Sequence, residues 1–467
     1  MTVIDDIAEV ESTVASARSA QLRFEAHGSQ LRYDRAAQAA AWAIMEPARN
    51  TYLAELAVET TGLGNVPDKI TKNHRKTLGL MRDIATAKTH GIISEDAETG
   101  IMQIARPIGV IGAVVPSTNP AATPANNIIN ALKCGNAIVL SPSPKGVPAC
   151  EVLIGYIHAE FDKIGEDRDL VQMVRGKGSK EKTQRLLEIS DLIVVTGSQN
   201  NVKRAYTSGT PALAVGAGNV TVIVDETCDL DDAAQKITAS KTFDNATSCS
   251  SENSIVVIDA VYDDFIVALA KAGGARITDE AAIVAKLWPD GHLNRSVIAQ
   301  DADKMLEALE MEGTVPSDTK FLAVETTGIG PDHPLSGEKL SRVAALYRAA
   351  DFDAAVNIMQ RIMTFQGAGH SVGIHTANVD RPIEIGTLIP TCRVIVNQAH
   401  TFATGGSFSN GMPFSLSMGC GSWGGNSIDD NVHWKHFMQT VKIIREIPAR
   451  EPKVEDIFAD YWKASGQ

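Results

Sequence analysis

The sequence lacks the features that mark several large classes of protein. Only 5% of its 467 residues are aromatic, its formal net charge is −13, and it has no block of lysines and arginines. These features argue against a nucleic-acid-binding protein. No apolar run approaches the ~20 residues that span a bilayer, and the N-terminus has neither the basic start nor the apolar core of a secretory signal. These absences predict a cytoplasmic protein with no membrane or nucleic-acid partner.

The cysteines are scattered, without the paired spacing of a disulfide framework or a zinc site. In a chain of this length that spacing is typical of reduced thiols in the cytoplasm. We therefore expect neither disulfides nor a bound metal. The cysteines are Cys134, Cys150, Cys228, Cys249, Cys392 and Cys420.

Helical patterns fill the N-terminal part of the chain, and strands alternate with helices after it. Residues 4–60 are almost continuously helical in pattern, with a break at Pro47. Residues 108–115 are nearly all apolar and rich in valine and isoleucine, as in a strand buried on both faces of a parallel sheet. In the next helix Thr123 fits as N-cap and Pro124 as first residue. The continuing alternation predicts a doubly wound α/β fold, whose ligands bind beyond the carboxyl ends of the strands.

Residues 243–253 form a polar loop that places Cys249 between an amphipathic helical pattern at 230–242 and an apolar strand at 254–258. Its small neighbours leave room for a substrate and for backbone N–H groups to reach an oxyanion, which suits a nucleophile. A free cysteine is more often a buried small hydrophobe, so the loop alone leaves both interpretations open. No G-x-G-x-x-G follows a strand, so a dinucleotide site would need another construction.

Six stretches, in one order along nearly the whole chain, are similar to motifs of the aldehyde dehydrogenase superfamily, specifically its CoA-acylating branch. That branch includes acylating sulfoacetaldehyde, succinate semialdehyde and acetaldehyde dehydrogenases. The ordered set makes Cys249 a confident candidate nucleophile. The stretches are residues 54–62, 69–74, 116–120, 243–252, 369–371 and 419–427.

The resemblance implies an aldehyde dehydrogenase-like fold with two doubly wound α/β domains and a small region of oligomerisation strands. Residues 1–225 would form the cofactor-binding domain, and residues 226–430 the catalytic domain that carries Cys249. Residues 93–107 and 434–450 would be the oligomerisation strands, so we expect a homodimer or homotetramer.

The resemblance also implies the chemistry. Cys249 would attack an aldehyde to give a thiohemiacetal, and hydride transfer to a nicotinamide would leave a thioester. The Asn119 amide and the Cys249 backbone N–H would hold the oxyanion, although Asn119 could instead cap a turn before Pro120. In the hydrolytic branch this asparagine stands one place earlier, where the chain has Thr118.

The choice of branch depends on Ala214, which stands where hydrolytic relatives carry the water-activating glutamate of an E-L-G-G-K motif. Without that base the thioester would wait for a thiol, and coenzyme A is the acceptor implied. His370 could accept the proton of the CoA thiol or could simply bond to loop backbone.

For the cofactor, Gly197 and Ser198 resemble a pyrophosphate contact at a helix start, and Glu338 matches the glutamate that holds the nicotinamide ribose. The loop 141–145 lacks the acid that would repel a 2′-phosphate, and basic residues at Lys145, Lys177 and Lys180 favour NADP over NAD. The candidate cofactor residues are Ser141, Pro142, Lys145, Gly197, Ser198, Gly216 and Glu338.

The loop at 400–410 is rich in hydroxyl groups and would line an aldehyde pocket. With Arg393 and His400 nearby it suits a small anionic aldehyde. We therefore favour sulfoacetaldehyde, with succinate semialdehyde or acetaldehyde as alternatives and a catalytically silent member of the fold as a further one. The candidate substrate ligands are Thr118, Arg393, His400 and Ser407.

Overall fold

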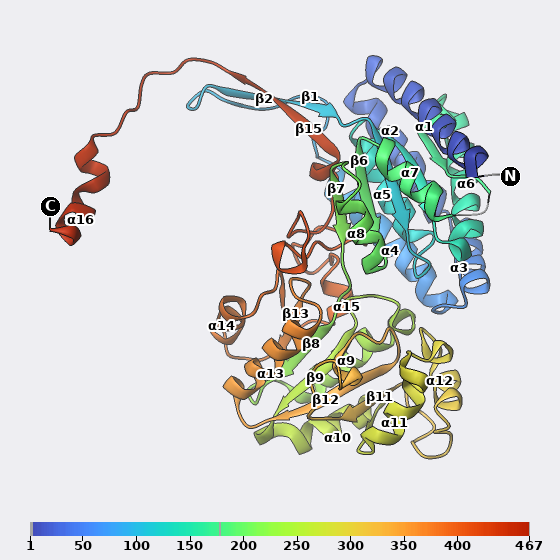
Figure 1. The fold of residues 1–467 in the computed structure, drawn as a ribbon, viewed down its shortest axis with the longest axis vertical. Coiled ribbons are helices and arrows are strands. Elements are labelled where there is room, and N and C mark those ends of the chain that lie inside the picture. Colours follow the sequence, from blue (N-terminus) through green and yellow to red (C-terminus); the bar gives the residue numbers. More distant parts are fainter. Residues whose placement is uncertain (1–2, 177–178, 467) are drawn as a thin grey trace.

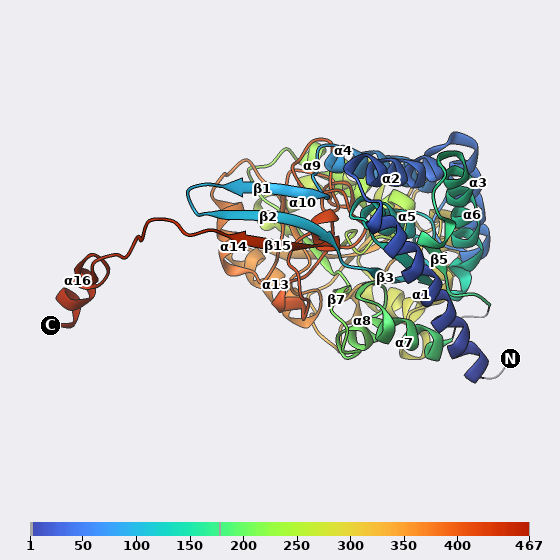
Figure 2. The ribbon, with the colours of Figure 1, turned by 90° about the horizontal axis from the view of Figure 1, so that it is seen from above.

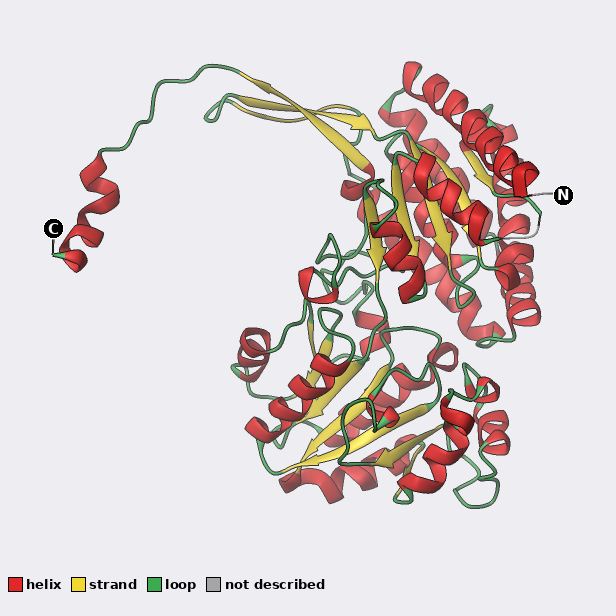
Figure 3. Ribbon diagram, in the orientation of Figure 1, coloured by secondary structure: helices red, strands yellow, loops and turns green. Residues whose placement is uncertain are grey.

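The computed structural model describes residues 3–176 and 179–466, and its core contains two parallel sheets in two lobes (Figures 1 and 3). The first sheet has five strands in the order β5-β4-β3-β6-β7, all parallel. Its central strand is buried along its whole length, as an all-apolar run predicts. The strands are β3 (Val110–Val115), β4 (Ala137–Pro142), β5 (Val171–Met173), β6 (Leu192–Thr196) and β7 (Ala212–Val215).

Helices pack around this sheet, α1 against α7 and α2 against α5 and α6 (Figure 2). The helical pattern at 4–60 proves to be three helices, because the chain also turns at Gly28, where a side chain would meet the Tyr33 hydroxyl at 2.5 Å. The helices are α1 (Val3–Ala26), α2 (Gln30–Met45), α3 (Pro47–Thr61), α4 (Val66–Ile84), α5 (Ala122–Lys133), α6 (Val147–Ile164), α7 (Lys180–Ile189) and α8 (Gln199–Tyr206).

One predicted helix start is wrong. The helix α5 begins at Ala122, so Thr123 and Pro124 both lie in its first turn. Ala121 occupies the N-cap position without a side-chain cap, and the Thr123 hydroxyl has no hydrogen-bond partner among the residues described.

The second sheet has seven parallel strands in the order β10-β11-β12-β9-β8-β13-β14. Because β8 pairs with β9 and β13, the two sheets divide between Val215 and Val220, earlier than the expected boundary at residue 225. The strands are β8 (Val220–Val224), β9 (Glu252–Ile258), β10 (Gly274–Ile277), β11 (Phe321–Glu325), β12 (Val343–Ala349), β13 (Val372–His375) and β14 (Val394–Val396). The helices are α9 (Leu230–Thr242), α10 (Tyr262–Ala272), α11 (Glu280–Leu287), α12 (Ala302–Ala308), α13 (Phe352–Phe365), α14 (Arg381–Leu388) and α15 (His400–Ala403).

The chain then returns to the first lobe. Phe414, Val432 and Phe437 are fully buried and share a hydrophobic core with β3 and β4. Of these three, Phe414 lies within the expected catalytic domain, 226–430, so that segment buries at least one apolar side chain in the core of the first lobe.

An antiparallel arm extends from the first lobe (Figures 1 and 2). It contains β1 (Gly91–Asp96), β2 (Ile101–Pro107) and β15 (Met438–Ile444), with β2 between the others, so the tail does form the expected edge strand. The last helix, α16 (Val454–Ser465), stands apart from both lobes. Among the residues described, no helix is long and apolar enough to cross a membrane.

Candidate active site

A cavity of about 610 Å³ brings together residues from both lobes. Its wall contains the loops after β3, β4 and β6, the cysteine loop, one face of α4, and parts of the segment 401–418. Carboxyl ends of parallel strands meet at this edge, as the doubly wound fold predicts. The cavity gathers nine of the candidate residues: Thr118, Asn119, Ser141, Pro142, Gly197, Ser198, Gly216, Cys249 and Glu338.

The loop that carries Cys249 begins with an unusual backbone. Asp244, Asn245 and Ala246 have φ angles of 46°, 55° and 60°. Left-handed conformations cost an L-residue about 1–2 kcal/mol each, and such a run persists only where surrounding contacts hold it. The run turns the chain sharply after α9 and places Cys249 at the cavity wall, just before β9.

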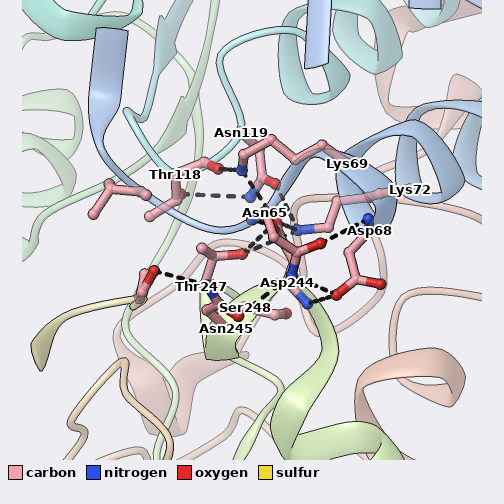
Figure 4. Close-up of polar contacts among 12 residues, drawn as sticks. Asn65, Asp68, Lys69, Lys72, Thr118, Asn119, Asp244, Asn245, Thr247 and Ser248 are labelled. Atoms are coloured by element: carbon pink, nitrogen blue, oxygen red, sulfur yellow. Dashed lines mark hydrogen bonds and ion pairs between the residues drawn. The ribbon is translucent and has the colours of Figure 1, made fainter. Parts of the chain in front are cut away.

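Asp244 supplies the contacts that hold this turn (Figure 4). Its fully buried carboxylate accepts hydrogen bonds from the Lys69 and Lys72 ammonium groups, from the Asn65 backbone N–H at 3.0 Å and from the Thr247 hydroxyl at 2.8 Å. Although burial opposes its ionisation, the two lysines hold the pKa of Asp244 below its usual range. The pair of lysines on α4 therefore fixes the cysteine loop against the first lobe.

Lys72 also orients Asn119. Its ammonium group donates to the Asn119 side-chain oxygen at 2.9 Å (Figure 4). Because that oxygen is occupied by a donor, the amide N–H₂ faces the opposite way, toward Thr118 and the cavity. An N–H donor held in this way suits an oxyanion that forms beside Cys249.

His370 contacts the nucleophile directly, with Nε2 3.2 Å from the Cys249 sulfur. Burial raises the pKa of the Cys249 thiol to about 12, with Glu338 adding to the effect, and burial lowers the pKa of His370 to about 3. Both groups are therefore neutral near pH 7, so the cysteine needs a base before it can attack. The neutral imidazole lies where such a base must stand.

A second histidine continues this chain of contacts. His370 Nδ1 lies 2.8 Å from the Ser371 hydroxyl, which lies 2.9 Å from His400 Nε2. If Ser371 donates to His400 and accepts from His370, the lone pair of His370 Nε2 faces the thiol. The Gly369-His370-Ser371 motif indicated the first histidine, but nothing in the sequence linked it to His400.

Glu338 is the carboxylate of the cavity wall. Burial raises its pKa to about 8, although a hydrogen bond from the Gly218 backbone N–H opposes the rise. Glu252, three residues after Cys249, is buried behind the loop and does not reach the cavity. Burial also raises the pKa of Glu252, although nearby Lys241 opposes the rise.

Five candidates lie outside the cavity wall, His370 behind Cys249 and four others. Arg393 is buried and donates to the carbonyl oxygens of His370 and Gly419 at 2.9 and 2.8 Å, so it positions the histidine and does not meet a substrate. His400 is committed to Ser371. Ser407 and Lys145 also face other partners, the Ser409 hydroxyl at 3.0 Å and the Thr61 carbonyl at 3.4 Å.

Of the two adenosine-side lysines that the structure describes, one lines the cavity. Lys180 lines the cavity and Lys145 does not, whereas Lys177 lies outside the described residues. Arg204, which sequence reasoning missed, joins Lys180 in the wall and donates to the Lys180 carbonyl at 3.0 Å.

Ala214 is fully buried in an apolar cluster with Leu187, Val202 and Ala205. The next residue, Val215, lines the cavity. This strand end thus offers the cavity no carboxylate that could activate water.

Sequence reasoning missed three cations on α4. Lys72, Arg75 and Lys76 stand three and four residues apart, on one face of the helix, and all three line the cavity. The cationic wall that was expected from Arg393 and His400 comes instead from this helix.

Comparison with known proteins gives a consistent result. Residues 5–281 match the aldehyde dehydrogenase family. The chain is 54% identical over 460 residues to a sulfoacetaldehyde dehydrogenase (acylating) of Cupriavidus necator, covering 98% of this chain and 93% of that one. An acetylating aldehyde dehydrogenase from Geobacillus thermoglucosidasius superimposes with a TM-score of 0.91 at 31% identity, over 97% and 99% of the two chains. A Rhodopseudomonas palustris propionaldehyde dehydrogenase with bound propionyl-CoA gives 0.83 at 25% identity, over 93% and 94%.

Proposed function

Because the chain belongs to the aldehyde dehydrogenase family and is a CoA-acylating member of it, we propose that it converts sulfoacetaldehyde, coenzyme A and NAD(P)⁺ to sulfoacetyl-CoA and NAD(P)H. The observation that carries the chemistry is Cys249 beside His370 in a cavity without a water-activating acid at β7. The choice of aldehyde is supported by the similarity to the Cupriavidus necator enzyme and by the cations of α4.

The first half of the reaction begins when His370 accepts the thiol proton and Cys249 attacks the aldehyde carbon. The carbonyl oxygen becomes an oxyanion, which the Asn119 amide and the Cys249 backbone N–H stabilise. Loss of a hydride from the same carbon then turns the thiohemiacetal into a thioester. A nicotinamide bound in the cavity supplies the hydride acceptor.

The cavity offers residues that fit such a cofactor. Ser198, the N-cap of α8, makes no side-chain capping bond, which leaves the first N–H groups of the helix open to a phosphate. Lys180 and Arg204 add positive charge nearby, and no carboxylate at the end of β4 would repel a 2′-phosphate. We propose on these grounds that NADP is preferred over NAD, with Glu338 at the nicotinamide ribose.

Before the second half, His370 releases the first proton to solvent. The CoA thiol then gives its proton to His370 and its sulfur attacks the thioester, and the Cys249 thiolate leaves and takes that proton back from His370. A neutral histidine suits this step because its free lone pair can accept the thiol proton. We also propose that the enzyme works in the cytoplasm, since all six of its cysteines are free thiols.

The test follows NAD(P)H absorbance with sulfoacetaldehyde, succinate semialdehyde and acetaldehyde, each with and without CoA. We expect sulfoacetaldehyde to give the highest kcat/KM, sustained turnover only with CoA, and no turnover in Cys249→Ala. Steady turnover without CoA would contradict the acylating mechanism. A higher kcat/KM with another aldehyde would show that the proposed substrate is wrong.

A further inference from the structure

Two of the cations on α4 have no acidic partner among the described residues. Lys72 is paired with Asp244, whereas Arg75 and Lys76 form no ion pair in that part of the chain. Arg75 donates to the Phe402 and Gly406 carbonyls at 2.6 and 3.3 Å. Lys76 donates to the carbonyl oxygens of Gly405 and Ser415, in the latter case at 3.1 Å.

This arrangement is costly for the folded protein. Burying a charge without a counter-charge destabilises a protein by several kcal/mol. Burial, with Arg75 and Lys72 nearby, lowers the pKa of Lys76 to about 7. Such a cost is typical of a binding site that a ligand of opposite charge completes.

Both cations line the same cavity as the nucleophile. Arg75 lies over the Phe402 ring, with 5.2 Å between its guanidinium carbon and the ring centroid. Phe243 packs against Phe402, with 4.5 Å between the ring centroids, and lines the cavity. The Arg75 guanidinium therefore lies over a pair of aromatic rings, one of which shares the cavity wall with Cys249.

We propose that Arg75 and Lys76 bind the anionic group of the aldehyde and thereby make the enzyme select an anionic substrate. This inference rests on the proposed function, in which that group is a sulfonate. A sulfonate has three acceptor oxygens and a permanent negative charge, which suit a guanidinium fork and an ammonium group together.

The spacing along α4 suits a short molecule. Lys72 orients Asn119 at the carbonyl end of the substrate, and Lys76 stands one turn further along the helix. Four residues rise by about 6 Å in an α-helix. The carbonyl and the anionic group of a short aldehyde can therefore each meet their own part of α4.

The test compares an anionic with an uncharged aldehyde in Arg75→Gln and Lys76→Gln. Loss of a hydrogen bond to a charged group costs about 1.5–3 kcal/mol, which is a fall in kcat/KM of about 10- to 100-fold. We expect this fall with sulfoacetaldehyde, mainly through KM, and little change with propionaldehyde. Equal losses with both aldehydes would overturn the inference, because the cations would then serve the thiol or the fold.

Arg82→Gln is the matched control. Arg82 lies on the same helix and donates to the Ser407 carbonyl at 3.3 Å, but it does not line the cavity. Its replacement removes the same charge from α4 and should leave the ratio of the two kcat/KM values unchanged. A change as large as that of Arg75→Gln would mean that the net charge of α4, rather than contact with the substrate, sets selectivity.

A test on the wild-type protein avoids any folding defect in the variants. Ethanesulfonate should inhibit propionaldehyde oxidation competitively, and the uncharged analogue ethyl methyl sulfone should not. Equal inhibition by the two would overturn the inference. A wild-type enzyme that oxidises propionaldehyde but not sulfoacetaldehyde would contradict the proposed function, whereas a loss of sulfoacetaldehyde activity in the variants alone supports both.

Discussion

At the scale of single residues, the nucleophile is held as a neutral thiol, which needs a base before it can attack. Cys249 is protonated near pH 7 because burial raises its pKa to about 12, and His370 is deprotonated because burial lowers its pKa to about 3. The reactive pair is therefore a neutral thiol beside a neutral imidazole. If Ser371 donates to His400, His370 carries its proton on Nδ1 and turns the lone pair of Nε2 toward the sulfur.

This pair predicts the effect of His370→Gln. General-base catalysis contributes about 10²- to 10⁴-fold, so we expect kcat/KM to fall by at least about 100-fold while Cys249 remains reactive at high pH. Stopped-flow measurement of the first NAD(P)H turnover between pH 7 and 10 checks this, because hydroxide replaces the lost base. The control is His158→Gln, whose ring meets the Val171 carbonyl at 2.8 Å, away from the cavity. A flat pH profile in His370→Gln would exclude the role of base.

Lys76 predicts a pH dependence that belongs to the anionic substrate alone. Its pKa is about 7, so it is charged below pH 7 and neutral above, with Arg75, Lys72 and Cys249 as its charged or titratable neighbours. The ratio of kcat/KM for sulfoacetaldehyde to that for propionaldehyde should therefore fall as pH rises from about 6 to 8. Taking the ratio cancels the ionisation of Cys249, which both aldehydes share. In Lys76→Arg the ratio should stay constant, and a constant ratio in the wild type would refute the prediction.

At the scale of elements, α4 performs three tasks with one face. Lys69 and Lys72 hold the left-handed turn through Asp244, Lys72 orients Asn119, and the following cations face the substrate. The turn is therefore both a structural and a catalytic element.

Asp244→Asn tests that dependence. The amide keeps the size of the side chain but leaves two buried lysines without a counter-charge, so we expect the free energy of unfolding to fall by about 3 kcal/mol. Urea denaturation measures the loss. Asp162→Asn, which removes an exposed ion pair with Arg168, should leave the urea midpoint nearly unchanged because surface pairs contribute little. An unchanged midpoint in Asp244→Asn would show that other contacts hold the turn.

The sequence predicted the elements better than the contacts between them. The helix at 230–242 and the strand after the cysteine loop follow from local periodicity, and the structure confirms both. The predicted start of α5 was wrong because Ala121, at the N-cap, makes no side-chain hydrogen bond that could mark the position. Arg393 was misjudged because only the fold shows that its guanidinium donates to the backbone carbonyls of His370 and Gly419. Pairings over such long sequence separations leave no local pattern.

At the scale of the whole molecule, the active site depends on both lobes. The first lobe contributes Asn119 and the loops after β4 and β6, and the loop before β9 in the second contributes Cys249. The segment that follows β14 returns to the first lobe and buries Phe414 there, which ties the two lobes together.

The arm predicts self-association. Val441 and Ile443 on the edge strand β15 are 46% and 39% exposed, and an exposed apolar edge strand invites pairing with another chain. We expect a homodimer or homotetramer by multi-angle light scattering, and a smaller mass for the double variant Val441→Lys, Ile443→Lys, because charges on the edge oppose pairing. Val379→Lys is the matched control, since Val379 is a 79% exposed valine in a loop before α14. A monomeric wild type would contradict the prediction. An unchanged mass in the double variant would show that the subunits associate through a surface other than the arm.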